Sequence, residues 1–168
     1  MEAGVQELDL DDLDLRILAI LQADSSLSNI DLAQRALASA PTCLRRVRKL
    51  KEAGLIEREV AVLDFSKIAS TVTAVIEVSL DRQAVEDYDA FEAYVCAEAA
   101  VTQCYRVSPG PDFVVIVELP DMRSYDEFAR RLFTQSSNVR NVRTFFSTGR
   151  AKFEANPPIA TVLGTRNR

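Results

Sequence analysis

The chain has 168 residues, of which 48% are apolar and 27% charged, and its 25 acidic and 20 basic residues give a formal net charge of −5. This composition is typical of an ordinary globular protein with one domain or two small ones. Histidine is absent, which excludes Ser-His and Cys-His nucleophile pairs and histidine-bound metal sites.

Neither the apolar runs nor the cysteines indicate an exported or metal-binding protein. No apolar run approaches the roughly 18 residues of a membrane span, and the acidic N-terminus lacks a signal peptide's basic start. Cys43, Cys96 and Cys104 are an odd number without Cys-x-x-Cys spacing, so neither a disulfide framework nor a zinc site is indicated. We expect a cytoplasmic protein without metal or cofactor.

The segment LDLDDLDLRILAILQAD, residues 8–24, predicts a first helix. Its apolar residues recur at helical spacing: Leu13, Ile17, Ile20 and Leu21. Asp9, Asp11 and Asp12 lie at its start, where carboxylates cap free amides and complement the helix dipole. A helix start explains this acidic cluster better than a metal site.

Two further helices are indicated before residue 55. In the second, Ser28 and Asp31 have the form of a capping box. The expected apolar face of this second helix consists of Ile30, Ala33 and Leu37. For the third helix, Ser39 is the expected N-cap, Pro41 lies in the first turn and Gly54 ends the helix.

The third predicted helix gathers positive charge in an acidic protein. Its residues 41–51 carry five cations and no acid: Arg45, Arg46, Arg48, Lys49 and Lys51. At about 100° per residue, Leu44, Val47 and Leu50 form an apolar back. On the opposite side we expect Thr42, Arg45, Arg46 and Lys49, with Arg48 on the flank.

A helix-turn-helix whose second helix has a cationic front fits the major groove of DNA. Arginine can bridge the two acceptors of guanine, and lysine neutralises phosphate. A solvated basic face is the alternative, but five cations without an intervening acid forgo the i,i+4 ion pairs of a merely solvated helix. The pattern therefore favours a nucleic-acid partner. LIEREVAVLD, residues 55–64, alternates like a strand, with Ile56, Arg58, Val60 and Val62 on one side.

The remaining residues predict the order β-α-β-β-α-β. Strands are expected in TVTAVIEVSL, VTQCYRVS, FVVIVEL and VRNVRTFFS, and helical stripes in YDAFEAYVCAEA and from Tyr125 to Leu132. Such a segment folds as a four-stranded antiparallel sheet with both helices on one face. The open face of the sheet predicts self-association. The tail from Asn156 has no periodicity and is expected to be mobile.

Aromatic residues in this half also raise the alternative of RNA stacking: Tyr105, Phe113, Phe145 and Phe146. No RNP-like run is present and the segment is net acidic, so core or interface packing is favoured.

Both halves together resemble the Lrp/AsnC (feast/famine) family of transcriptional regulators. The resemblance covers roughly residues 8–152 and rests on LDxxDxxILxxLQ, SNxxLA, CLRRVxxL, AGLI and LPDMRSYDEF. It implies an α+β protein: a winged or plain helix-turn-helix domain at 8–60, a hinge at 61–70, a ferredoxin-like effector and oligomerisation domain at 71–153, and a tail at 154–168. It further implies a dimer, or an octamer built from dimers, that binds promoter DNA and an amino acid or related metabolite.

The resemblance also assigns candidate residues. The residues that it predicts to contact DNA are Ser28, Asn29, Thr42, Arg45, Arg46, Arg48 and Lys49. The residues that it predicts to contact an effector are Pro109, Gly110, Asp112, Thr144 and Thr148. Pro109 stands where the family has glycine and lacks an N–H, so SPGPD is either an effector site or only a structural turn. Leu37 stands in place of the glycine between the DNA-binding helices, where the second helix could be longer. The prediction is thus a non-enzymatic, DNA-binding regulator; the alternative is a small-molecule-binding or scaffolding oligomer whose helical domain binds protein.

Overall fold

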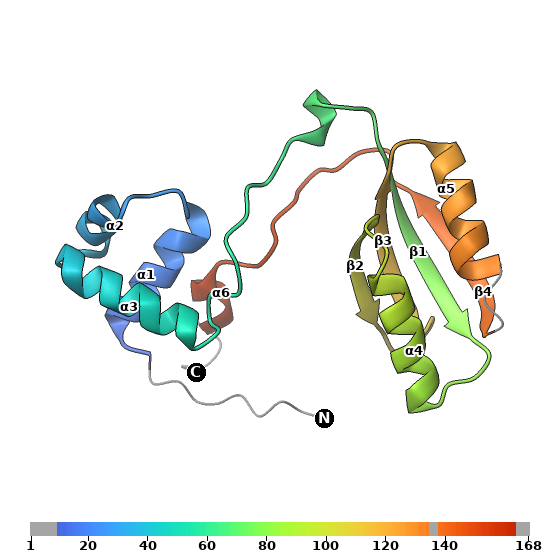
Figure 1. Ribbon diagram of the computed structural model, residues 1–168, viewed down its shortest axis with the longest axis horizontal. Coiled ribbons are helices and arrows are strands. Elements are labelled where there is room, and N and C mark those ends of the chain that lie inside the picture. Colours follow the sequence, from blue (N-terminus) through green and yellow to red (C-terminus); the bar gives the residue numbers. More distant parts are fainter. Residues whose placement is uncertain (1–9, 135–137, 164–168) are drawn as a thin grey trace. The chain divides into compact units, whose positions relative to one another are not determined.

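The computed structural model describes residues 10–134 and 138–163, which divide into two compact units joined by two chain segments (Figure 1). The helical unit contains the described chain up to Val62 together with the chain from Phe153 onward. The sheet unit is Leu63–Lys152. The division lies within the range predicted for the hinge, while Asp9 and the last residues of the predicted tail fall outside the described residues.

Among the described residues, the helical unit contains the helices α1 (Asp12–Ala23), α2 (Asn29–Ala36), α3 (Ala40–Glu52) and α6 (Ile159–Leu163). Its buried core is made by Ile17, Leu32, Ala33, Ala36, Cys43 and Leu50. In α2 this differs from the prediction, because Leu32 and Ala36 accompany Ala33 in the core while Ile30 and Leu37 are exposed. None of the helices in the described chain is long and apolar enough to cross a membrane.

The predicted helix starts are confirmed by their hydrogen bonds. Asp11 caps α1, and its carboxylate accepts the N–H of Asp14 at 2.9 Å in a capping box. This N–H, together with the Arg46 guanidinium, holds the pKa of Asp11 below its usual value. The Ser28 and Ser39 hydroxyls cap α2 and α3 by accepting the N–H groups of Asp31 and Thr42, while the Asp31 carboxylate accepts the Ser28 hydroxyl and not the backbone N–H that the predicted capping box needs. These caps satisfy amides that the first helical turn leaves without a partner.

The turn between α2 and α3 is built on a leucine in the left-handed conformation. Helix α2 ends at Ala36 and is not lengthened, and Leu37 adopts φ 57° and ψ 46°. Residues other than glycine and asparagine rarely adopt this backbone conformation. The Nδ2 of Asn29 donates to the carbonyl of Ala40 at 2.9 Å and braces the start of α3.

The strand predicted at residues 55–64 is wrong for this chain. No strand lies between α3 and β1 in the described part of the chain, where a short 3-10 turn, η1 (Phe65–Lys67), is the regular element. Val60 and Val62 are exposed. A β-strand needs a neighbour to satisfy its backbone, and the alternating segment has no such neighbour within the described chain.

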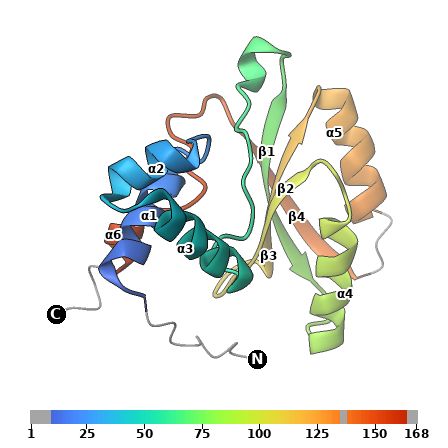
Figure 2. The ribbon, with the colours of Figure 1, turned by 60° about the vertical axis from the view of Figure 1, so that its left-hand side comes forward.

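The sheet unit confirms the predicted α+β, ferredoxin-like arrangement. Its elements are β1 (Val72–Leu80), α4 (Val85–Cys96), β2 (Val101–Arg106), β3 (Phe113–Leu119), α5 (Met122–Ala129), a π-helical end η2 (Arg130–Thr134) and β4 (Val139–Phe146). The antiparallel strands lie in the order β2-β3-β1-β4. Both α4 and α5 cover the same face of the sheet (Figure 2).

Alternation along the strands divides the sheet into a packed face and an open face. Ile76 and Val78 of β1 and Phe113 of β3 are fully buried beneath the helices. The Phe113 ring lies 4.8 Å from that of Phe91 and 5.7 Å from that of Tyr88. Phe113 is therefore a core residue and does not offer a surface for stacking bases.

The described residues after Asn156 belong to the segment that is predicted to be a mobile tail. They include α6, which lies beside α1 (Figure 1). The Gln22 side chain brackets this segment: its Nε2 donates to the carbonyl of Pro157 at 2.8 Å, and its Oε1 accepts the N–H of Ile159 at 2.9 Å. The helical unit is thus built from two parts of the described chain that are far apart in the sequence.

Candidate DNA-binding surface and effector site

The buried face of α3 is formed by Cys43 and Leu50, with Val47 at its margin. Leu44, expected in the apolar back, is 56% exposed. Cys43 occupies the core position that was predicted for Leu44, so α3 is rotated about its axis relative to the prediction. This rotation brings Arg46 to the core side of the helix. Burial raises the pKa of the Cys43 thiol.

Arg46 is an internal ion-pair partner, and its predicted outward orientation is wrong. Its guanidinium lies 2.8 Å from Asp11 and 3.0 Å from Asp14, whose side chain is fully buried. The Nε atom of Arg46 is buried without a hydrogen-bond partner in the described structure. Arg46 therefore neutralises a carboxylate of α1 and links α1 to α3.

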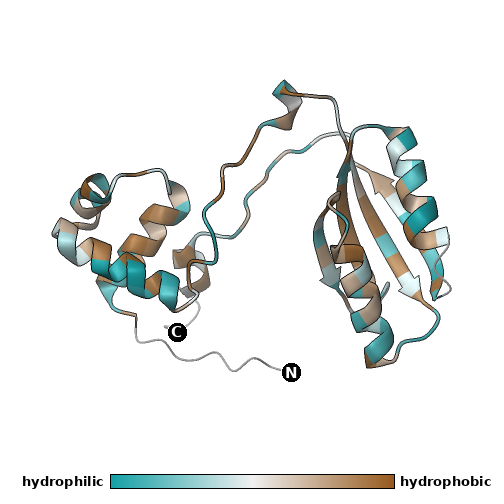
Figure 3. Cartoon of the chain, viewed as in Figure 1, coloured by the Kyte–Doolittle hydropathy of each residue, from teal (hydrophilic) through white to brown (hydrophobic). Residues whose placement is uncertain are grey.

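Three of the five cations remain available to a partner. Lys51 pairs with Glu59 at 2.9 Å. Arg45, Arg48 and Lys49 are exposed, and they form no ion pair with any residue that the structure describes. Figure 3 shows the polar residues of α3 in teal beside the apolar α1. Since unpaired cations on one helix attract an anion, this outer face of α3 is the candidate DNA-binding surface.

The other predicted DNA contacts have local partners. Ser28 is exposed at the start of α2, and its hydroxyl donates to Asp31 at 2.6 Å. Ser39 donates to the Thr42 hydroxyl at 2.8 Å. Asn29, which braces Ala40, positions α3 through the backbone.

The predicted effector turn has an exposed and a buried part. The Ser108-Pro109 peptide bond is cis, and Pro109 and Gly110 are exposed. Gly110 has φ 126°, in the left-handed region that favours glycine; a Cβ there would meet no atom within 4 Å, so backbone conformation and not space requires the glycine.

The Asp112 carboxylate, which is predicted to contact an effector, accepts three hydrogen bonds within the protein. It accepts the N–H of Leu80 at 2.7 Å, the Tyr88 hydroxyl at 2.7 Å and the Gln83 amide at 2.9 Å. Burial acts to raise the pKa of Asp112, but these three donors outweigh it and hold the pKa below its usual value. Asp112 joins the ends of β1 and β3 to the start of α4.

A hollow of about 290 Å³ lies on the open face of the sheet beside this turn. It is lined by Glu77, Ser79, Gly110, Pro111, Asn141 and Arg143. Arg143 lies directly opposite Glu77 in the β1–β4 pairing, 3.0 Å away, and stacks on Phe145 at 5.2 Å. Sequence reasoning missed Glu77 and Arg143, because their proximity depends on the pairing of two strands, β1 and β4, that are far apart in the sequence.

Thr144 and Thr148 do not line this hollow. The Thr144 hydroxyl lies 2.6 Å from that of Tyr125 in α5, on the face of the sheet that the helices cover. Thr148 is exposed after the end of β4. The alternation of β4 thus gives Asn141 and Arg143 the position that was predicted for Thr144.

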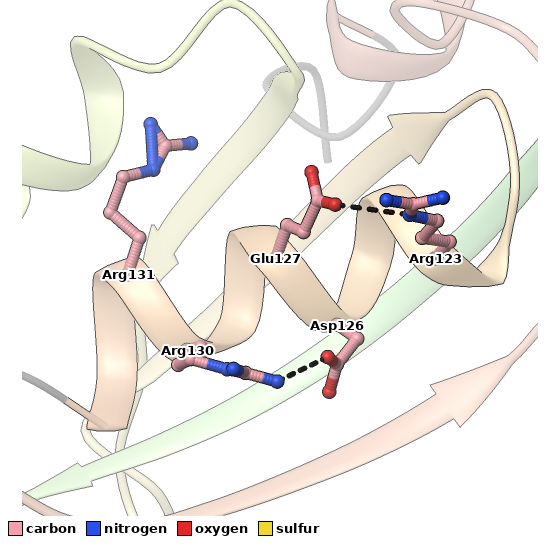
Figure 4. Close-up of a pocket in the computed structure, with 5 residues that line it drawn as sticks. All are labelled: Arg123, Asp126, Glu127, Arg130 and Arg131. Carbon is pink, nitrogen blue, oxygen red and sulfur yellow. Dashed lines mark hydrogen bonds and ion pairs between the residues drawn. The ribbon is translucent and has the colours of Figure 1, made fainter.

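A second hollow follows the outer side of α5 and η2, and its charges neutralise one another. Arg123 pairs with Glu127 at 3.3 Å and Asp126 with Arg130 at 2.7 Å, while Arg131 extends away from both pairs (Figure 4). Arg131 pairs instead with Glu98 at 2.9 Å. These i,i+4 pairs are typical of a solvated helix surface.

A helix-turn-helix with a cationic outer face, joined to a βαββαβ domain, defines a two-domain transcriptional regulator. Residues 10–57 match the model of a winged helix-turn-helix DNA-binding domain, and residues 73–157 match that of the Lrp/AsnC ligand-binding domain. The chain belongs to the Lrp/AsnC family of transcriptional regulators.

Relatives with these two domains are similar over most of their length. The leucine-responsive regulatory protein of Rhizobium meliloti is 35% identical over 148 residues, 88% of this chain and 95% of the relative. The DNA-binding transcriptional activator DecR of Escherichia coli is 30% identical over 150 residues, 89% of this chain and 99% of the relative. These relatives are transcriptional regulators and not enzymes.

Solved structures agree with this assignment. An AsnC-family regulator from Agrobacterium tumefaciens has a TM-score of 0.84 and 33% identity, and covers 92% of this chain and 100% of its own. A Neisseria meningitidis regulator in complex with L-Met has a TM-score of 0.83 and 27% identity, and covers 92% of this chain and 99% of its own.

Proposed function

We propose that this regulator binds double-stranded DNA through Arg45, Arg48 and Lys49 on the outer face of α3. The observation that carries the proposal is that these three cations are exposed on the second helix of the pair and form no ion pair with another described residue. An α-helix fits the major groove, where guanidinium groups bridge guanine acceptors and ammonium groups neutralise phosphate. Ser28 and Thr42 add hydroxyl groups at the N-terminal starts of α2 and α3. We also place the protein in the cytoplasm, where the DNA of its bacterial relatives lies.

A salt titration tests this surface. Three cations per protomer make six in a dimer, so the log–log slope of affinity against salt should be roughly −5. The variant R45A/R48A removes four of them and should reduce the slope to roughly −2. Fluorescence anisotropy with random-sequence duplex DNA measures both slopes.

The matched control is R123A/R130A, which removes the same charge from the sheet unit and should leave the slope unchanged. An unchanged slope in R45A/R48A would contradict the proposed surface. Absence of DNA retention by the wild-type protein at low salt would favour the alternative that the helical unit binds protein.

We further propose that the hollow on the open sheet face binds an amino-acid effector. Arg143 is suited to the α-carboxylate and Glu77 to the α-ammonium group, and both line the hollow beside Gly110. The hollow has the volume of a small metabolite, and the Neisseria relative is in complex with L-Met. Because charge-assisted hydrogen bonds contribute about 1.5–3 kcal/mol, R143A should weaken binding roughly 10- to 100-fold.

Calorimetric titration with a panel of amino acids that begins with L-Met and L-Leu measures this affinity. R130A is the control, because it removes an arginine from the helix-covered side of the sheet unit. An amino acid that binds R143A as tightly as the wild-type protein would exclude this hollow as its site.

We also propose that the protein is a homodimer formed through the open sheet face, from which octamers can assemble. The alternating strands direct apolar side chains to this face: Val75, Tyr105, Val114, Ile116 and Phe145. A soluble chain seldom leaves such a surface wet. Sedimentation equilibrium should show that I116E is monomeric and that R123E, on the outer helix surface, retains the wild-type mass.

A further inference from the structure

Leu44 is an exposed apolar side chain of α3 beside the exposed cations Arg45 and Arg48. It is 56% exposed and lies one helical turn from both Pro41 and Arg48. Leu44 is neither buried in the core of the helical unit nor packed against it. Its side chain therefore contributes little to folding, although it adjoins the cations that are proposed to meet DNA.

Single exposed leucines are common on protein surfaces and need no special explanation by themselves. Leu44 differs because of its position in the site. The helix is anchored from behind by Cys43 and Leu50 and by the Arg46 ion pairs to α1, so its outward face has a defined orientation. When Arg45 and Arg48 reach a duplex, Leu44 reaches it too.

We propose that Leu44 recognises the C5-methyl group of a thymine in the major groove. This inference rests on the proposed function of α3. The thymine methyl is the apolar group that a standard base pair presents in this groove, and aliphatic side chains contact it. Leu44 can form no hydrogen bond to a base, so the complementary feature of DNA is this methyl group. The flanking arginines hold the helix against phosphates and guanines, and Leu44 adds discrimination at one base pair.

The experiment removes the methyl group without changing base pairing. Full-length wild-type protein selects duplexes from a random-sequence pool, and each thymine of a selected duplex is then replaced by uracil, one at a time. Burial of one methyl group corresponds to about a fourfold change in affinity. We expect one thymine in each half-site whose replacement weakens wild-type binding about fourfold. The variant L44A should bind the thymine and uracil duplexes equally.

The variant L63A is the matched control, because Leu63 is a leucine of similar exposure, 54%, that lies outside the helix pair. It should retain the preference for thymine. If the wild-type protein binds its selected duplex but no uracil replacement alters affinity, or if L44A retains the full preference, the role of Leu44 is refuted while DNA binding stands. Failure of the wild-type protein to select any duplex at low salt would refute both this role and the proposed function.

Discussion

Arg46 and Asp14 show how neighbouring cations of one helix divide between stability and binding. Asp14 is fully buried in α1, and its charge is compatible with burial because Arg46 lies against it. An isolated buried carboxylate is strongly unfavourable. Arg45, the preceding residue, is exposed and neutralises no buried carboxylate among the described residues. Adjacent arginines in one cationic run therefore have different physical roles.

Replacement of Arg46 by alanine should destabilise the helical unit. The substitution leaves Asp14 buried without a counter-ion. We expect the free energy of unfolding to fall by about 3 kcal/mol, which is the low end of the range for broken buried ion pairs, because Arg46 is partly exposed. Amide hydrogen exchange at α1 and α3 measures the loss separately from the sheet unit. R45A should change the same protection by less than about 0.5 kcal/mol. Equal protection in both variants would contradict the structural role of Arg46.

The buried Asp112 should make the stability of the sheet unit depend on pH. Its folded pKa lies below the usual 3.8, so the unfolded chain binds the proton more tightly. The stabilisation by Asp112 is complete above pH of about 4 and is lost as the pH falls through the folded pKa. Urea unfolding across this range should show a flatter acid dependence in D112N than in the wild-type protein. Identical pH profiles would show that Asp112 is not coupled to folding.

At the scale of elements, a short turn determines how the two DNA-binding helices meet. Leu37 ends α2 in a conformation that a leucine tolerates poorly, while the Asn29–Ala40 hydrogen bond and the Ser39 cap start α3. The turn is maintained by its surroundings and not by the preference of its central residue.

Substitution of Leu37 by glycine should stabilise the helical unit. Glycine adopts positive φ without steric cost, and the 85% exposed leucine loses little burial. The left-handed conformation costs other residues about 1–2 kcal/mol, which the greater freedom of glycine in the unfolded chain partly offsets, so a net gain of about 0.5–1 kcal/mol is expected. Thermal unfolding followed by circular dichroism measures it. I30G, at an exposed helical position, should destabilise by about 1 kcal/mol; a similar loss in L37G would contradict the argument.

The alternating segment after α3 shows the limit of local pattern at this scale. Its residues have the composition of a strand, yet Val60 and Val62 remain exposed because no described strand of the same chain pairs with them. An alternating pattern shows that a segment can form a β-strand, but the strand forms only where another strand is available to pair with it.

At the scale of the whole molecule, the chain passes from the helical unit to the sheet unit and returns. The return segment ends in α6, which Gln22 fastens to α1 with two hydrogen bonds. A change in the sheet unit therefore has two covalent routes to the DNA-binding helices, one through residues 63–71 and one through the segment that leads to α6.

Loss of the Gln22 bracket should release the C-terminal segment. Removal of about 1 kcal/mol of hydrogen bonding corresponds to roughly fivefold faster amide exchange in residues 159–163 of Q22A. Exchange in β1 and β3 should stay the same. Q34A, which changes an exposed glutamine of α2, is the control. Unchanged exchange of α6 in Q22A would show that the bracket does not hold it.

The sequence by itself determined the elements whose causes are local or periodic. Asp11, Ser28 and Ser39 predicted three helix starts because a cap acts within three residues. The alternation in β1 and β3 predicted the sheet, and the cationic run predicted the surface of α3. Only the tertiary structure decided which of these cations stay outside, because a rotation of α3 by one residue exchanges Cys43 for Leu44 and turns Arg46 inward. It likewise brought Glu77 opposite Arg143, since register between distant strands depends on the packing of the entire sheet.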